Sequence, residues 1–286
     1  MGKILVTGAT GNVGREIIAE LRRRGRTADT VAAVSNPARS ASELGDDIQY
    51  VKLDFADQNT YDPALNGIDK IFLLRPPQIS DIPRYITPFI QAAKAANVRQ
   101  IVFLSLIGVD KNRVVPHAKV EDALRTAGVP WTMLRPSFFM QNLNTTHREE
   151  IRDGDEIFVP AGNGKTSFID VRDIGAVGGM ALDEEGHENM VYELTGSEAL
   201  TYGEVAAVMS EVLGRTITYR KPSLLAFITR WKARGQPTDF VFVMAGIYTT
   251  ARLGLAARLT DETAMLLKRP PITLRQYVDD YRSAWE

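Results

Sequence analysis

The chain contains no cysteine among its 286 residues. This absence excludes disulfide bonds, thiol nucleophiles and cysteine-ligated zinc or iron–sulfur clusters. Histidine is scarce as well, and His117, His147 and His187 show no spacing such as HExxH that would indicate a metal site. We therefore expect no metal ion.

The chain also lacks an excess of either charge. Its 34 basic residues are balanced by 35 acidic ones, which gives a formal net charge of −1. Proteins that bind nucleic acid usually present a clustered positive surface. The basic run Arg22–Arg24 closes a predicted amphipathic helix, so we interpret it as a solvated helix end. No nucleic-acid partner is expected.

Long apolar runs are missing too. No stretch approaches the ~18 consecutive apolar residues of a membrane span, and the N-terminus leads into a predicted strand without the features of a signal peptide. We expect no membrane partner and a cytoplasmic location. The length allows one large α/β domain or a core with a smaller second lobe.

Short apolar runs alternate with helical patterns in the first half of the chain, which is typical of βαβ units and a parallel sheet. The predicted strands are Lys3–Thr7, Thr30–Val34, Ile48–Lys52, Ile71–Leu74, Ile101–Ser105 and Trp131–Leu134. Helices are predicted between them, including Val13–Leu21, Ile86–Ala96 and Ala118–Ala127. After Pro136 the predicted elements are an extended Lys165–Asp170, a helix from Ile174 capped by Asp173, a helix over Tyr202–Leu213 and a largely helical region over 224–269.

The segment GATGNVG lies between the first predicted strand and the first predicted helix. In a dinucleotide-binding loop, Gly8 allows the tight turn, Gly11 lets the backbone approach the pyrophosphate, and Gly14 permits close packing of helix and strand. The phosphates then lie at the helix N-terminus. A glycine-rich turn without a ligand is the alternative. The predicted phosphate-binding residues are Gly8, Thr10, Gly11, Asn12, Val13 and Gly14.

No acidic residue follows the second predicted strand, where NAD-preferring sites usually carry one that binds the ribose 2′-hydroxyl. Arg39 is predicted to pair with a 2′-phosphate instead, and Ser35 and Asn36 to add hydrogen bonds. An ordinary surface cation is the alternative for Arg39. The expected cofactor is thus NADP(H) rather than NAD(H). Asp54, with Phe55 beside it, is placed either to reach the adenine amine or to cap a turn.

Several segments, in this order, resemble the NmrA-like branch of the atypical short-chain dehydrogenases/reductases. They are TGATGNVG, HAKVEDAL, GVPWTMLRPSFFMQN, FIDVRDIG and EEGHENMVYELTG followed by LTYGEVAAVMSEVLGR. The resemblance runs over nearly the whole chain and points to the quinone oxidoreductase type 2 and triphenylmethane reductase subgroup. It implies a doubly wound Rossmann-type α/β core over residues 1–150. Residues 151–286 would form mostly a smaller C-terminal α/β substrate lobe, with segments around 165–196 returning to the core.

The chain departs from the superfamily's usual catalytic motif, YxxxK, whose tyrosine donates a proton and whose lysine holds the nicotinamide ribose. Alignment on Glu121 puts the lysine position at His117 and the tyrosine position at Arg113. Lys119, two residues along, would point to a different face of the helix. The ordinary alcohol dehydrogenase mechanism is therefore not supported.

Two functions remain open. In the first, the protein transfers hydride from NADPH to a conjugated small molecule such as a quinone or a dye, an acceptor that needs little acid assistance. His117 is then the candidate catalytic residue, holding the ribose or relaying a proton with its ordinary pKa of about 6.5. In the second, the protein binds NADP(H) without turnover and reports redox state to a partner. A sugar epimerase is a weaker third option, because that reaction also uses the absent tyrosine.

Aromatic and polar residues follow the sixth predicted strand, at the sheet edge where open α/β folds bind ligands. Phe138, Phe139 and Asn142 are predicted to line the pocket of a small-molecule substrate, with plain core packing as the alternative for the two phenylalanines. The remaining predicted cofactor contacts lie at strand ends and at the start of the later helix: Leu74, Arg75, Ser105, His117 and Pro136. The oligomeric state stays open, with a homodimer as one option.

Overall fold

The computed structural model describes residues 2–286, which form two compact units. Unit 1 comprises the chain up to Pro136 together with Val171–Leu194, and unit 2 comprises Ser137–Asp170 and Thr195–Glu286. Residues 137–150, expected in the core, group with unit 2, because the strand Phe138–Phe139 pairs with a strand of that unit. The segment that returns to unit 1 lies within the expected 165–196 region.

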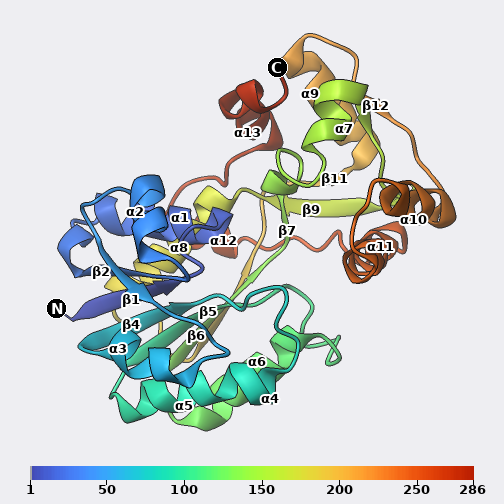
Figure 1. Ribbon diagram of the computed structural model, residues 1–286. Helices are drawn as coiled ribbons and strands as arrows, with labels where there is room; N and C mark the ends of the chain where they lie inside the picture. Colours follow the sequence, from blue (N-terminus) through green and yellow to red (C-terminus); the bar gives the residue numbers. More distant parts are fainter. Residues whose placement is uncertain (1) are drawn as a thin grey trace. The chain divides into compact units, whose positions relative to one another are not determined.

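A seven-stranded parallel sheet forms the centre of unit 1 (Figure 1). Its strands are β1 (Lys3–Thr7), β2 (Thr30–Val34), β3 (Gln49–Lys52), β4 (Ile68–Leu73), β5 (Gln100–Leu104), β6 (Trp131–Pro136) and β10 (Met190–Leu194). The spatial order is β10-β6-β5-β4-β1-β2-β3, and every neighbouring pair is parallel. The predicted doubly wound Rossmann-type fold is confirmed. The order reverses between β1 and β4, so the loops after these strands lie where such sheets bind ligands.

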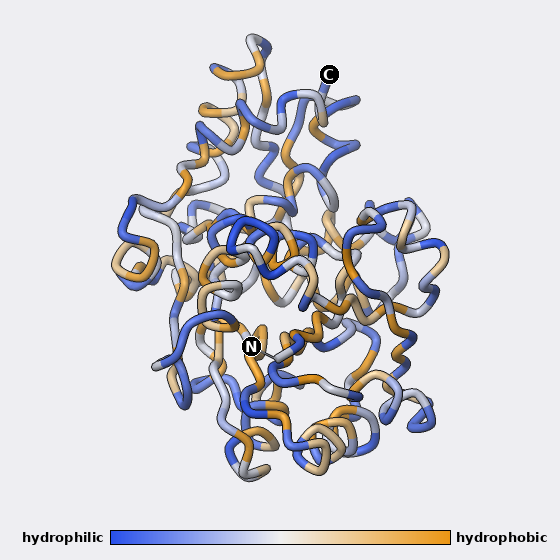
Figure 2. Tube along the Cα trace, turned by 90° about the vertical axis from the view of Figure 1, so that its left-hand side faces the viewer, coloured by the Kyte–Doolittle hydropathy of each residue, from blue (hydrophilic) through white to orange (hydrophobic). Residues whose placement is uncertain are grey.

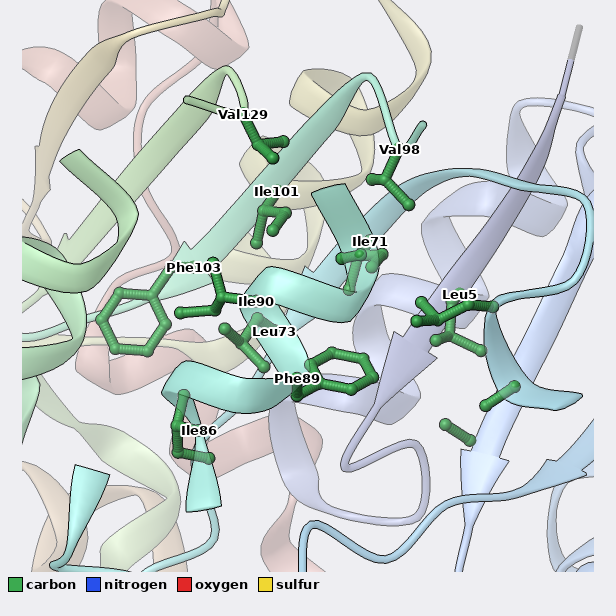
Figure 3. Packing of buried hydrophobic residues seen from close by; sticks show 14 of the residues in the cluster. Leu5, Ile71, Leu73, Ile86, Phe89, Ile90, Val98, Ile101, Phe103 and Val129 are labelled. Carbon is green, nitrogen blue, oxygen red and sulfur yellow. The ribbon is translucent and has the colours of Figure 1, made fainter. Parts of the chain in front are cut away.

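Helices cover both faces of this sheet (Figure 1). One face carries α1 (Asn12–Arg23), α2 (Pro37–Leu44) and α8 (Val171–Asp183), and the other carries α3 (Tyr61–Leu65), α4 (Ile82–Tyr85), α5 (Thr87–Ala95) and α6 (Pro116–Ala127). The core between the sheet and α5 is apolar: Leu5, Leu73, Phe89 and Ile101 pack together in Figure 3, all fully buried. Burial of such side chains is the main stabilising contribution in this unit.

Two strands are longer than the sequence predicts, because charged residues lie inside them. β4 begins at Ile68, since Lys70 is buried and its ammonium group donates to a backbone carbonyl oxygen at 3.0 Å. β6 continues to Pro136, since Arg135 is buried and paired with Glu121. Buried charges of this kind require a partner, which a strand pattern read from hydrophobicity does not reveal.

The returning segment also differs from its prediction. The helix begins at Val171 rather than Ile174, so Asp173 lies in the first helical turn and does not precede the helix as a cap. β10 (Met190–Leu194) was not predicted, and it extends the sheet by pairing with β6. Glycines on one side of α8 allow it to pack closely on α1, because a Cβ at Gly178 would lie 2.3 Å from the side chain of Ile17.

Unit 2 is the smaller α/β body and has its own apolar core. Its strands are β7 (Phe138–Phe139), β8 (Glu156–Ile157), β9 (Lys165–Ile169), β11 (Ala199–Thr201) and β12 (Thr218–Tyr219). Its helices are α7 (Arg148–Gly154), α9 (Tyr202–Leu213), α10 (Leu224–Ala233), α11 (Thr238–Arg252), α12 (Glu262–Leu267) and α13 (Leu274–Asp280). The predicted bounds of α9 are confirmed, and its first turn is closed by a capping box between Thr201 and Glu204.

Polar and apolar residues alternate along the helices at helical spacing. In Figure 2 the tube changes between orange and blue within single helical turns, as expected for helices that bury one side. α1 is an example, with Val13, Ile17, Ile18 and Leu21 buried on one side. Within residues 2–286, no helix combines the length and the apolarity that a membrane crossing requires.

Candidate functional site

The loop between β1 and α1 has the geometry of a phosphate cradle. Gly8 adopts a φ of +61°, in the left-handed region that favours glycine. The backbone N–H of Gly11 donates to the carbonyl oxygen of Gly8 at 3.0 Å and closes a tight turn. A Cβ at Gly14 would lie 2.2 Å from the same oxygen. Position 14 therefore admits only glycine while α1 packs this closely on the loop.

The N-terminus of α1 has no side chain that satisfies its backbone N–H groups. Gly11 is the N-cap and makes no side-chain capping bond, and the first helical turn contains no acidic residue. Thr10, Gly11 and Asn12 are exposed, whereas Val13 is buried and offers only its backbone. Unpaired N–H groups at the positive end of a helix dipole attract phosphate. Apart from the Gly8 carbonyl group, nothing lies within 4 Å of a Cβ built on Gly11, so the cradle has room for a ligand.

The residues after β2 begin the next helix. Ser35 and Asn36 are exposed, and the side-chain oxygen of Asn36 accepts a hydrogen bond from the backbone N–H of Arg39 at 3.2 Å. Asn36 is therefore the N-cap of α2. Arg39 lies inside α2 with a side chain that is 80% exposed, and its Nε is 3.4 Å from the carboxylate of Glu43. Arg39 is therefore an exposed helix residue and does not lie in a loop.

The end of β3 presents one polar residue and one core residue. A carboxylate oxygen of Asp54 accepts a hydrogen bond from the backbone N–H of Ala56 at 2.8 Å, which is the turn-capping role. Phe55 is buried and packs edge-to-face on Phe89, with ring centroids 5.2 Å apart. Phe55 therefore offers only its backbone to a ligand, and a contact between Asp54 and adenine stays a prediction.

Arg75 braces the loop that follows β4. Its Nη1 donates to three carbonyl oxygens, those of Pro76, Pro77 and Ile79, at 2.8, 3.1 and 2.7 Å. Burial lowers the pKa of Arg75 from its ordinary value. The backbone of Leu74 is fixed as well, because its N–H donates a hydrogen bond of 2.7 Å to the hydroxyl oxygen of Thr7, at the end of β1. The loops after β1 and β4 are thus tied together at the switch point.

His117 lies in the first turn of α6, partly buried, with its ring centroid 6.1 Å from that of Phe103. Burial and the nearby charge of Arg75 lower the pKa of His117 to about 4, against a smaller opposing effect of Glu121. The side chain is therefore neutral at pH 7, and a proton relay based on an ordinary pKa of 6.5 does not fit. Its Nδ1 is buried and has no hydrogen-bond partner among residues 2–286. An orphaned buried nitrogen of this kind suits a ligand group.

A buried ion pair joins β5, β6 and α6 at the same edge. Ser105 donates to Glu121 at 2.6 Å, and Arg135 donates to it through two nitrogens at 2.9 and 2.6 Å. Burial opposes ionisation of Glu121, but the hydrogen bonds from Arg135 and Ser105 outweigh it and lower the pKa of that carboxyl group. At the end of β6 the carbonyl oxygen of Pro136 accepts from Ile107 at 3.0 Å. The hydroxyl group of Ser105 thus already donates its hydrogen bond to Glu121.

The predicted substrate residues belong to unit 2. Phe138 and Phe139 form β7 and are partly buried. Phe138 packs edge-to-face on Phe168 at a centroid distance of 5.6 Å, which is the core-packing role. Asn142 is partly buried, and its carbonyl oxygen accepts from the backbone N–H of His147 at 3.0 Å. Lining of a substrate pocket by these residues stays a prediction.

A cavity of about 860 Å³ lies elsewhere in unit 2, lined by α7 and α10 residues such as Glu150 and Trp231. None of the predicted site residues lines it. Its arginines and carboxylates largely pair with one another, as Arg234 does with Glu150 at 2.6 Å. Among residues 2–286, no three potential metal-ligating side chains gather to hold a metal ion. The candidate site therefore lies at the carboxyl ends of the parallel strands of unit 1.

The sequence of this chain matches a family of known proteins. The NmrA-like family profile matches residues 1–230. This chain belongs to the NmrA-like family. An NAD(P)H azoreductase of Xenophilus azovorans is 31% identical to it over 286 residues, which is 99% of each chain. The predicted family resemblance is thereby confirmed.

Two solved structures share the fold of this chain. The NADPH-dependent quinone oxidoreductase of Escherichia coli in complex with NADPH superposes with a TM-score of 0.88 at 28% identity, covering 97% of this chain and 99% of the other. The triphenylmethane reductase of Citrobacter sp. in complex with NADP(H) gives 0.85 at 25% identity, with the same coverage. Two of these three relatives are thus solved with NADP(H) or NADPH bound, and the third is named as an NAD(P)H azoreductase.

Proposed function

We propose that this NmrA-like protein is an NADP(H)-dependent reductase that transfers hydride to a conjugated small molecule such as a quinone or a dye. The observation that carries the proposal is the open cradle at the N-terminus of α1, where uncapped N–H groups follow a glycine turn. The azoreductase, which is 31% identical over the whole length, supports the class of reaction. We place its action in the cytoplasm.

The residues fit a dinucleotide along the carboxyl edge of the sheet. The backbone of Gly8–Gly14 would hold the pyrophosphate, and Ser35, Asn36 and Arg39 would hold the 2′-phosphate. His117 would hydrogen-bond the nicotinamide ribose through its unpartnered Nδ1. The other proposed contacts are Asp54, Phe55, Leu74, Arg75, Ser105 and Pro136, several of them through the backbone. Phe138, Phe139 and Asn142 are proposed to line the acceptor site.

When bound, NADPH supplies the hydride. The protein contributes orientation, since Arg75 holds its loop rigid through three carbonyl oxygens and the buried Glu121 fixes α6 against β5 and β6. His117 is neutral, so it would position a hydroxyl group of the nicotinamide ribose by a hydrogen bond and not by its charge. A conjugated acceptor spreads the charge it receives, so water suffices as the source of the proton.

The Arg39→Ala variant tests the 2′-phosphate contact. A charge-assisted bond to phosphate is worth roughly 1.5–3 kcal/mol, so we expect the dissociation constant of NADPH to rise about tenfold or more. The dissociation constant of NADH should change by less than about twofold, because NADH has no 2′-phosphate. Titration by tryptophan fluorescence measures both. Equal losses for the two cofactors would remove Arg39 from the 2′-phosphate site.

The pH dependence of turnover tests the role of His117. Because its pKa is about 4, its charge does not change between pH 5 and 8. The wild-type kcat/KM should therefore show no inflection near pH 6.5, and the His117→Ala variant should lower kcat/KM about tenfold across that range, as expected for a lost positioning hydrogen bond. An inflection near pH 6.5 that disappears in His117→Gln would contradict this role.

A redox sensor is the second candidate. It is favoured by the residue that stands where the superfamily carries its proton-donating tyrosine. Arg113 lies there, exposed and paired with Asp122, so this position offers no acid. Assays of NADPH and NADH oxidation with a panel of quinones, azo dyes and triphenylmethane dyes separate the two candidates. We expect turnover with NADPH and at least one of these classes. Tight NADPH binding without turnover on the whole panel would favour the sensor.

A further inference from the structure

A cluster of three charged residues, Arg15, Glu43 and Arg39, lies beside the phosphate loop. Nε of Arg15 donates to the carbonyl oxygen of Thr10 in that loop at 2.7 Å. Nη2 of the same guanidinium group donates to Glu43 Oε2 at 2.7 Å, and Nε of Arg39 lies 3.4 Å from Glu43 Oε1. One carboxylate is thus shared by two arginines from different helices, and one of these arginines also contacts the phosphate loop.

The cluster lies where the two parts of the predicted cofactor site meet. Arg15 belongs to the first turns of α1, immediately after the cradle, and Arg39 and Glu43 lie one turn apart on α2. α2 begins at Asn36, the predicted neighbour of the 2′-phosphate. The carboxylate of Glu43 thus pairs with one guanidinium group from each of the two helices that begin at the predicted pyrophosphate and 2′-phosphate positions.

We propose that Glu43 sets how strongly this protein prefers a 2′-phosphate, by competing with that phosphate for Arg15 and Arg39. The inference rests on the proposed NADP(H) site. Arginine forms bidentate pairs with carboxylate and phosphate alike, so the two anions compete for the same donors. Arg15 is then a second residue that binds the 2′-phosphate, and only the structure reveals it. Glu43 weakens the binding of the 2′-phosphate by both Arg15 and Arg39.

The direction of the effect follows from the exposure of the three side chains. They are 41%, 35% and 80% exposed for Arg15, Glu43 and Arg39. Ion pairs this exposed contribute little to holding arginines in place. A carboxylate next to a phosphate dianion, however, repels it within the Debye length of about 8 Å. Repulsion therefore outweighs any benefit that Glu43 gives by orienting the arginines.

Calorimetric titration with adenosine 2′,5′-bisphosphate and 5′-AMP tests the proposal without any turnover. The Glu43→Gln variant keeps an oxygen that accepts from Arg15 but removes the charge. We expect it to bind the bisphosphate about fivefold more tightly than the wild type, a gain of about 1 kcal/mol, and to bind 5′-AMP with unchanged affinity. Arg15→Gln should weaken bisphosphate binding about tenfold and 5′-AMP binding much less, because only the bisphosphate carries the 2′-phosphate.

Asp47→Asn is the control, because it removes a negative charge that is 49% exposed, against 35% for Glu43, and that pairs with Arg22 of α1 at 2.5 Å. Arg22 lies seven residues, about 10 Å along the helix, from Arg15. We expect no change for Asp47→Asn with either ligand. The proposal is overturned if Glu43→Gln leaves bisphosphate affinity unchanged, weakens it, or shifts both ligands equally. Wild-type turnover with NADPH, assayed separately, decides the proposed function, so the two failures are distinguishable.

Discussion

A Gly11→Val variant is expected to reach the native fold and to lose NADPH affinity by about hundredfold or more. The side chain would project from the uncapped start of α1, into the space proposed for the pyrophosphate. The loss of two or more hydrogen bonds to a charged group, each worth roughly 1.5–3 kcal/mol, gives this magnitude. The fold should persist, because the Cβ meets only the Gly8 carbonyl oxygen, at 3.3 Å.

Gly14→Ala provides the comparison that separates binding from folding. Its Cβ would lie 2.2 Å from the Gly8 carbonyl oxygen and 2.8 Å from Ala9 Cα, so α1 has to shift. Overpacking of this kind costs about 1–3 kcal/mol. Thermal denaturation followed by circular dichroism should show a clearly lower Tm for Gly14→Ala and a smaller decrease for Gly11→Val, whose valine is a poorer N-cap residue than glycine. Retained NADPH affinity in a folded Gly11→Val protein would contradict the assignment of the loop.

The Glu121→Gln variant is expected to lower the free energy of unfolding by about 3 kcal/mol or more. Glu121 is fully buried and accepts from Arg135 and Ser105. Removing one partner of a buried ion pair leaves the other charge unpaired, at a cost of roughly 3–5 kcal/mol. Asp122→Asn is the control: its carboxylate pairs with Arg113, both more than half exposed, and should contribute less than about 1 kcal/mol. Urea denaturation measures both variants.

The same pair gives a pH dependence whose sign is fixed by the pKa. Because the pKa of Glu121 is lower in the folded protein than its ordinary value of 4.5, the unfolded chain takes up a proton first as the pH falls. The stabilisation is complete above about pH 4.5 and is lost as the pH falls through the lower, folded pKa. Glu121→Gln should therefore show a flatter loss of stability on the acid side. An equally steep loss in both proteins would exclude Glu121 as a source of acid sensitivity.

Several regular segments were predictable because hydrophobic periodicity indicates them directly. The strands Lys3–Thr7 and Thr30–Val34 have the predicted bounds, and so does the helix Tyr202–Leu213 of unit 2. These segments carry uninterrupted apolar runs or clear helical spacing. The glycine turn was predictable as well, since a positive φ at Gly8 and the close approach at Gly14 restrict both positions to glycine.

Features that depend on distant partners were not predictable from the sequence. Arg135 makes the end of β6 look polar, although its charge is buried against Glu121 on a different element. The pairing of Arg15 with Glu43 joins residues 28 positions apart, and no local pattern signals it. The pKa of His117 depends on burial and on Arg75 from another loop, which is why an ordinary pKa was a poor guide. In each case packing, rather than periodicity, decides the outcome.

The central claim, that this protein is an NADPH-dependent reductase, is tested most directly by a single-turnover experiment. The purified protein is mixed with one equivalent of NADPH and then, without oxygen, with an excess of a quinone or a triphenylmethane dye, and the absorbance of the reduced nicotinamide is followed by stopped flow. For the wild type we predict complete loss of that absorbance, at a rate far above that of the protein-free control. For Gly11→Val we predict a rate close to that of the protein-free control. NADPH that is bound by the wild type yet stays reduced with every acceptor class would contradict the account.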